Sequence, residues 1–175
     1  MPASHSSAYA VSLTQTALRV LVVINIVFGV AVLLLLPLSF FWEPQLVANF
    51  RAKWPSTDGL VLLQRLRLLV LIGLPGFPIV HLLLQRLRAI VQSVRDRDPF
   101  VAENSERLRF MAWAMLAWQL MNLLFGVLAR LWSPENARIE WSFSFAGWMS
   151  VLLLFVLAQV FEAGTRMRQD LEGTV

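Results

Sequence analysis

The distribution of charge is the feature that most constrains this chain. All 26 charged residues, 15 basic and 11 acidic, lie outside four uncharged stretches at 20–42, 68–85, 110–129 and 141–161. A helix rises about 1.5 Å per residue, so about 20 residues cross a hydrocarbon core roughly 30 Å thick. Because lipid offers the backbone no hydrogen-bond partners, each stretch is expected to be helical. The sequence therefore predicts an all-α integral membrane four-helix bundle with short loops.

The 175 residues are expected to form a single membrane domain, 1–175, because the helices and their connections leave no room for a soluble domain of about 100 residues. A hydrophobic fraction of 58% and a mean hydropathy of +0.65 are typical of helices that face lipid. The first helix is interpreted as a retained anchor, since no small-residue cleavage pattern follows it. The predicted helices span about 14–42, 60–95, 105–131 and 141–167.

The basic residues predict the orientation. Nine of the 15 Lys and Arg residues fall on the side of the central loop, 86–109, and of both termini, and six fall on the opposite side. Cytoplasmic loops carry an excess of Lys and Arg, so the loop and both termini are predicted to be cytoplasmic. The same residues suit lipid headgroups, and no long basic tail indicates direct nucleic-acid binding.

The second predicted helix contains helix-breaking residues in its middle, Gly73, Pro75, Gly76 and Pro78. Each proline removes a backbone donor and clashes with the preceding turn, which predicts a kink. A kink serves either as a packing device or as the site of a broken-helix binding pocket. Packing is favoured, because the second half of the chain has no matching interrupted helix of the kind that transporter repeats contain.

Several polar residues lie inside the uncharged stretches. An ionisable residue in a membrane helix is a functional candidate, and His81 lies just past the kink; the alternative is a neutral imidazole that bonds a carbonyl freed by the kink. Gln119 and Asn122 are three residues apart and share a helix face, which suits hydrogen bonds between helices. The candidate ligand or kink residues are His81, Pro75, Pro78, Asn25, Gln119 and Asn122.

The sequence predicts no catalytic, cofactor-binding or metal-binding residues. It contains no cysteine, which excludes disulfides, thiolate catalysis and Cys-ligated metals. The uncharged stretches contain no carboxylate, so paired-acid and His-Glu-x-x-His chemistry is missing from them, and no phosphate-binding glycine loop occurs. We therefore expect neither an enzyme nor a cofactor.

Two segments are more specific than the helices. One is Asp98-Pro99-Phe100-Val101-Ala102-Glu103-Asn104, followed by Arg107-Leu108-Arg109, and the other is the terminal stretch 161–175. With four helices in this order, the chain resembles the bacterial inner-membrane family known as domain of unknown function 2975. The resemblance implies location in that membrane and no established activity. Family members are often encoded beside a small helix-turn-helix regulator of the Xre type, which implies a membrane partner or antagonist for a DNA-binding protein.

Both segments lie on the predicted cytoplasmic side, and each mixes acids with arginines. DNA-binding helices are basic, so an acidic and aromatic loop suits such a partner. The alternative is that Asp96, Arg97 and Asp98 pair among themselves, and that Glu162 and Arg166, at i and i+4, only stabilise the last helix. The candidate partner-binding residues are Asp98, Pro99, Phe100, Glu103, Asn104, Arg107, Asp170, Leu171 and Glu172.

Two functions follow from these patterns. The first is a regulatory or sensory membrane protein that docks a cytoplasmic partner, such as a small Xre-type regulator, through loop 86–109 and the C-terminal tail. The second is a membrane protein that binds or transports a small ligand or a lipid with its kinked second helix. The lipid bilayer is a partner in both. A further alternative is a purely structural subunit of a larger complex, in which an apolar face around Trp113 and Trp118 contacts another chain. A homo-oligomer is a further candidate partner.

Overall fold

The computed structural model describes residues 3–56, 58–96, 98–132 and 142–172. Within this part the regular elements are all helices: α1 (Ala3–Phe41), α2 (Glu43–Lys53), α3 (Gly59–Gly73), α4 (Gly76–Arg95), α5 (Ala102–Trp132) and α6 (Phe145–Glu172). Four segments are long and apolar enough to cross a membrane, namely Leu13–Phe41, Gly59–Arg95, Ala102–Leu131 and Phe145–Leu171. The predicted all-α membrane bundle is confirmed.

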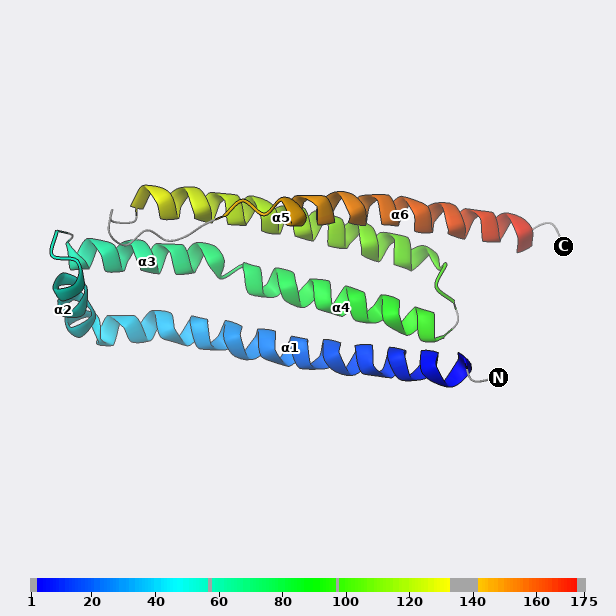
Figure 1. The fold of residues 1–175 in the computed structure, drawn as a ribbon, viewed down its shortest axis with the longest axis horizontal. Coiled ribbons are helices and arrows are strands. Elements are labelled where there is room, and N and C mark those ends of the chain that lie inside the picture. The colour runs from blue at the N-terminus through cyan, green and yellow to red at the C-terminus, as the bar shows by residue number, and fades with distance from the viewer. Residues whose placement is uncertain (1–2, 57, 97, 133–141, 173–175) are drawn as a thin grey trace.

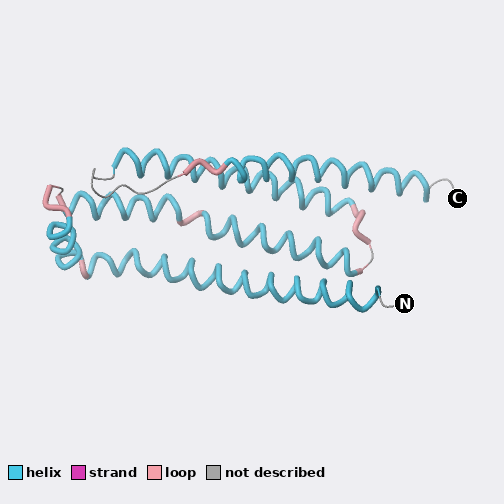
Figure 2. Tube along the Cα trace, viewed as in Figure 1, coloured by secondary structure: helices cyan, strands magenta, loops and turns pink. Residues whose placement is uncertain are grey.

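The bundle has two distinct ends (Figure 1). The start of α1, the connection between α4 and α5 and the end of α6 lie at one end, which we call the motif end. The short helix α2 lies across the other, which we call the α2 end. Figure 2 shows that the described loops lie at these two ends, at the break between α3 and α4, and before α6. The most extensive helix contacts join α5 to α6 and α1 to α4.

Large apolar side chains cover the outside of the bundle. Exposed fractions on α1 reach 54% for Leu33, 61% for Leu35 and 79% for Phe41. The buried side chains are few and come mainly from α3, α5 and α6, with Leu62, Ala112 and Val151 among them. In water such exposure would be costly at about 25 cal/mol per Å² of apolar surface, whereas lipid removes that cost. The surface is therefore that of a protein embedded in a bilayer.

The interruption predicted for the second span separates α3 from α4, and neighbouring helices fill it. The side-chain amide of Asn25 in α1 donates to the carbonyl oxygen of Phe77 at 3.1 Å. Gly29 lies against the Phe77 ring, because a β-carbon there would come within 3.1 Å of it. On the other side a β-carbon at Gly76 would clash with the indole of Trp118 in α5. The kink thus lets α1 and α5 pack closely on the second span.

Several helix bounds differ by a few residues from the approximate ones predicted. The connection 43–59 between the first two predicted helices contains helix α2, whose first turn holds Pro44 and whose last turn holds Arg51 and Lys53. The third span begins at Ala102 and not at 105, and the fourth ends at Glu172 and not at 167. Its expected start at 141 lies outside the described residues, and α6 begins only at Phe145.

The reasons for these differences are local. Ser144 caps α6, because its hydroxyl accepts a hydrogen bond from the Gly147 N–H at 3.1 Å. At the motif end both neighbouring helices extend past the uncharged stretches, so that most of loop 86–109 is helical and only 96–101 connects α4 to α5. Pro99 has no N–H to donate and lies in this short connection.

Candidate functional site

The connection between α4 and α5 is organised around Asn104, whose side chain is fully buried. Its amide nitrogen donates to the Ser93 hydroxyl at 2.6 Å and to the Pro99 carbonyl at 2.8 Å. Its carbonyl oxygen accepts from the Arg107 guanidinium at 2.6 Å. Asn104 therefore ties the end of α4, the connection and the first turns of α5 together, and its amide is not exposed to a partner.

The same connection packs directly on α6. The ring of Phe100 lies 5.4 Å from the ring of Phe161, and a β-carbon at Gly164 would come within 2.8 Å of Phe100. Asp98 accepts a hydrogen bond from Arg168 and forms an ion pair with it. The two segments that the sequence singled out, around 98–109 and 161–168, are thus neighbours in space.

A second ionic contact supports this packing. Glu162 of α6 pairs with Arg109 of α5 at 2.7 Å and with Arg166, one turn further along α6, at 2.5 Å. The Glu162–Arg166 pair was the expected i,i+4 interaction, whereas the link to Arg109 depends on the packing of α5 against α6. These side chains are 33–72% exposed, so each pair contributes about 1 kcal/mol or less.

Two acids of this end remain open to a partner. Glu103 and Glu106 are exposed on the first turns of α5 and make no hydrogen bond or ion pair within the described part of the chain. They border a cavity of about 310 Å³ together with Arg86, Arg107 and Phe110. The Arg86 guanidinium lies over the Phe110 ring at 4.9 Å. This surface combines free carboxylates with an arginine held on an aromatic ring.

The other predicted partner-binding residues lie at the end of α6. Asp170 and Leu171 are exposed, and Leu171 is 73% accessible. Glu172 is the last residue of α6, and its side chain lies outside the described part. The start of α1 joins this end through Gln15, which donates to Gln92 of α4 at 2.6 Å and accepts from Arg95 at 3.2 Å.

His81 occupies α4 inside the apolar part of the bundle. Its Nε2 atom lies 2.8 Å from the Gln85 side-chain nitrogen, one turn along the helix. Its Nδ1 atom is buried and has no hydrogen-bond partner among the described residues. Gln119 and Asn122 line a cavity that His81 does not border.

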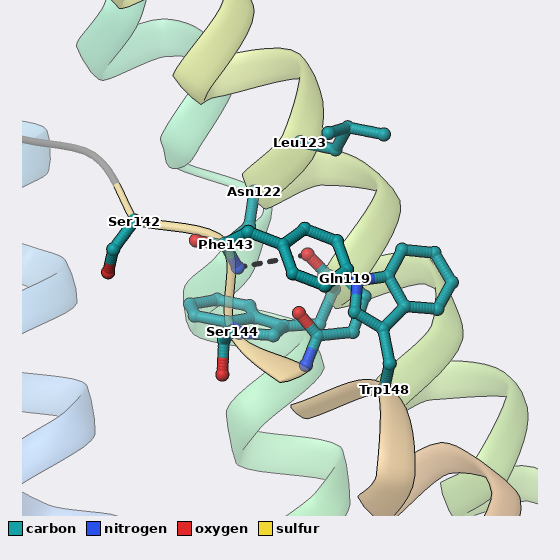
Figure 3. Close-up of a pocket in the computed structure, with 8 residues that line it drawn as sticks. Gln119, Asn122, Leu123, Ser142, Phe143, Ser144 and Trp148 are labelled. Atoms are coloured by element: carbon teal, nitrogen blue, oxygen red, sulfur yellow. Dashed lines mark hydrogen bonds between the residues drawn. The ribbon is translucent and has the colours of Figure 1, made fainter. Parts of the chain in front are cut away.

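That cavity lies between α5 and the start of α6 (Figure 3) and has a volume of about 310 Å³. Asn122 donates to the Trp118 carbonyl at 3.0 Å within α5. Gln119 is 7% exposed and faces Gly147, where a β-carbon would collide with its amide. The cavity is lined by Trp118, Gln119, Asn122, Leu123, Ser142, Phe143, Ser144 and Trp148.

Arg67 is an anchor at the α2 end that the sequence analysis did not single out. Its guanidinium donates to the Ser39 hydroxyl at 2.9 Å, the Ser39 carbonyl at 2.7 Å and the Glu43 carboxylate at 2.7 Å. It also lies 3.7 Å above the Phe40 ring, and its side chain is only 11% exposed. Its position two residues after Arg65, directly before the uncharged stretch 68–85, was the available signal.

Several partners were missed because they lie far away in sequence. Ser93, Phe161, Gly164 and Arg168 complete the motif end, and Gly147 completes the cavity beside Gln119. Trp113 is 59% exposed, whereas Trp118 is half-buried and its indole lies against Gly76. Within the described residues no three His, Asp or Glu side chains cluster as a metal site would require.

The chain belongs to the family described as "Protein of unknown function (DUF2975)", whose model matches residues 16–175. The resemblance suggested by the two motif segments is therefore confirmed over nearly the whole chain. Comparisons with curated proteins and with solved structures gave no match.

Proposed function

We propose that this member of a family of unknown function is a regulatory or sensory multi-pass membrane protein, not an enzyme, whose motif end docks a basic cytoplasmic partner. The partner class is a small DNA-binding protein, such as an Xre-type helix-turn-helix regulator. The membrane in question is the bacterial inner membrane, with both termini in the cytoplasm.

The observation that carries the proposal is the meeting of the two motif segments at one end of the bundle. The Asp98–Arg168 pair and the Phe100–Phe161 contact hold residues 98–104 on α6, although about 60 to 70 residues separate them in sequence. Such packing presents the first turns of α5 and the end of α6 as one surface. A docking surface of this kind needs a fixed shape, because flexible partners lose more entropy on binding.

The contacts divide the candidate residues into two groups. Phe100 and Asn104 build the end of the bundle, while Glu103 and Glu106 are exposed and free to pair with a basic partner. Charged groups at the rim of an interface steer association and fix which partner binds. Leu171, exposed at the end of α6, adds an apolar contact at the same end of the bundle.

The orientation is tested first, and the absence of cysteine makes the test simple. Single substitutions Glu106→Cys and Asn49→Cys place one thiol at each end of the bundle. With a membrane-impermeant maleimide and intact cells, we expect labelling of the Asn49→Cys protein only. Labelling of Glu106→Cys in intact cells would contradict a cytoplasmic motif end.

Partner docking is tested by purification in mild detergent, followed by mass spectrometry of the proteins that co-purify. The test variant is Glu103→Gln with Glu106→Gln, and the matched control is Gln45→Lys with Asn49→Lys on α2. Each double substitution raises the net charge by two, so a non-specific charge effect would act on both.

We expect a small basic DNA-binding protein with the wild type and the control. Its recovery with the test variant should fall about tenfold, which corresponds to two contacts of roughly 0.7 kcal/mol each. Equal recovery with test and control variants, or no such protein with any of them, would contradict the proposal.

The alternative of a ligand site at the kinked second span gains no support from the structure. Asn25, Gly29 and Trp118 fill the surroundings of the kink. We therefore expect the kink to act as a packing device.

A further inference from the structure

Helix α6 begins deep inside the bundle. Gln119 is the tenth residue of the uncharged stretch 110–129, so it lies roughly 15 Å from either end of that stretch. α5 continues 13 residues beyond it to Trp132, whereas α6 begins at Phe145, only two residues before the Gly147 that faces Gln119. Residues 142–144 reach this depth without forming a helix.

Irregular backbone at membrane depth is tolerated where it is buried in protein or lines a cavity, and helix ends at that depth are used to hold ligands. Figure 3 shows Ser142, Phe143 and Ser144 approaching α5 beside Gln119 and Asn122. The first turn of α6 carries the positive end of a helix dipole, with the Ser144 hydroxyl bonded to Gly147. The arrangement favours a hydrogen-bond acceptor at this point.

The Gln119 side chain also points to a ligand in this cavity. It is 7% exposed, lines the cavity and makes no hydrogen bond within the part of the chain that the structure describes. Among the described residues only His81 has a buried side-chain polar atom without a partner, so the Gln119 amide reaches the open space of the cavity. Gly147 allows the amide to reach this position, since any larger residue would collide with it. A bound acceptor would satisfy the amide donor.

The residues that line the cavity indicate what kind of ligand, besides its hydrogen-bond acceptor, fits there. Phe143 and Trp148 are stacked, with ring centroids 6.2 Å apart and an angle of 14° between the planes, and Trp118 contributes a third ring. The described lining residues are all uncharged, so an anionic phosphate would lack a counter-charge there. The volume of about 310 Å³ lies near the lower end of the range for small-molecule sites, roughly 300–1,000 Å³.

We infer that this cavity binds the carbonyl-bearing ring of an uncharged, lipid-soluble compound of the quinone class. One ring carbonyl accepts from Gln119, and the ring lies against the aromatic side chains. A planar ring matches flat aromatic walls, and a lipid-soluble tail keeps the compound at this depth. The site is distinct from the docking surface at the motif end and does not rest on the proposed function.

The test measures binding of decylubiquinone to the full chain in phosphatidylcholine nanodiscs by isothermal titration calorimetry, with empty nanodiscs subtracted. The variant Gln119→Met keeps the size of the side chain and removes its donor. Gln159→Met is the matched control, because Gln159 is exposed on α6 and does not line the cavity. We expect Gln119→Met to weaken binding about tenfold, which corresponds to the loss of one hydrogen bond, and the control to change it less than twofold.

Phe143→Ala serves as a second variant, since Phe143 is 56% exposed and its replacement is compatible with folding. It removes part of the aromatic wall and should also weaken binding at least threefold. Saturating decylubiquinone should raise the unfolding temperature of the wild type and of Gln159→Met equally, and that of Gln119→Met by less.

Three results would overturn the inference. The first is no heat above that of empty nanodiscs. The second is wild-type affinity in both Gln119→Met and Phe143→Ala. The third is binding of an anionic phosphatidylglycerol probe in place of the quinone.

Discussion

Replacing Asn104 with alanine should destabilise the protein more than any exposed substitution at the motif end. The side chain is fully buried and makes three hydrogen bonds, to Ser93, Pro99 and Arg107. It lies outside the uncharged stretch 110–129, so hydrogen-bond energies measured in soluble proteins apply. Two neutral bonds at about 1 kcal/mol each and one bond to a charged, half-buried group at about 1.5 kcal/mol give a loss of about 3.5 kcal/mol.

The assay is reversible unfolding of the purified protein in mixed micelles with increasing sodium dodecyl sulfate, followed by circular dichroism. The control is Asn49→Ala on α2, because Asn49 is exposed, and it should change the free energy of unfolding by less than about 0.5 kcal/mol. A loss of less than about 1 kcal/mol for Asn104→Ala would refute the view that this amide holds the connection on α4 and α5.

Three further substitutions test other contacts with the same unfolding assay. Arg67→Lys keeps the charge but cannot reproduce the three hydrogen bonds to Ser39 and Glu43, so we expect the free energy of unfolding to fall by about 1–2 kcal/mol. An unchanged free energy of unfolding would argue against a structural role for Arg67. Gly147→Ala should cost about 1–3 kcal/mol because its β-carbon would collide with the Gln119 amide, and a neutral effect would show that the contact is loose. Asp98→Asn should cost less than about 1 kcal/mol, and less still in high salt, since its pair with Arg168 is 42–46% exposed.

The membrane architecture could be predicted from the sequence because lipid imposes a strict rule. A stretch such as 20–42, with no charge and enough length, has to satisfy its own backbone groups as a helix. The kink could also be predicted from the sequence, because Pro75 and Pro78 cannot donate to the preceding turn. The neighbour that fills the kink could not be predicted, since the hydrogen bond from Asn25 to Phe77 depends on how α1 packs across α4.

At the motif end, local contacts could be predicted from the sequence and long-range contacts could not. Local pairing of Glu162 with Arg166 follows from helix periodicity, and it is present. Asp98, by contrast, pairs with Arg168, 70 residues further along the chain, and no local pattern indicates that contact. Exposed and buried polar residues in 98–107 also look alike in sequence, although Asn104 is fully buried and Glu103 is exposed.

The start of α6 is a similar case. The uncharged stretch 141–161 predicts a span of the right length, but it does not reveal that the helix begins at Phe145. The capping hydroxyl of Ser144 and the contact between Gly147 and Gln119 fix that start. Both residue types are common in membrane helices, so their role becomes visible only once α5 lies beside them.

Docking at the motif end is tested most directly by site-specific photo-crosslinking in living cells. A photoreactive phenylalanine analogue is placed at Glu103 or, as a control, at Gln45 of α2, both of which are exposed. We expect a covalent adduct with a small basic DNA-binding protein from position 103 and none from position 45. No adduct of that class from position 103, or an equal one from both positions, would contradict it.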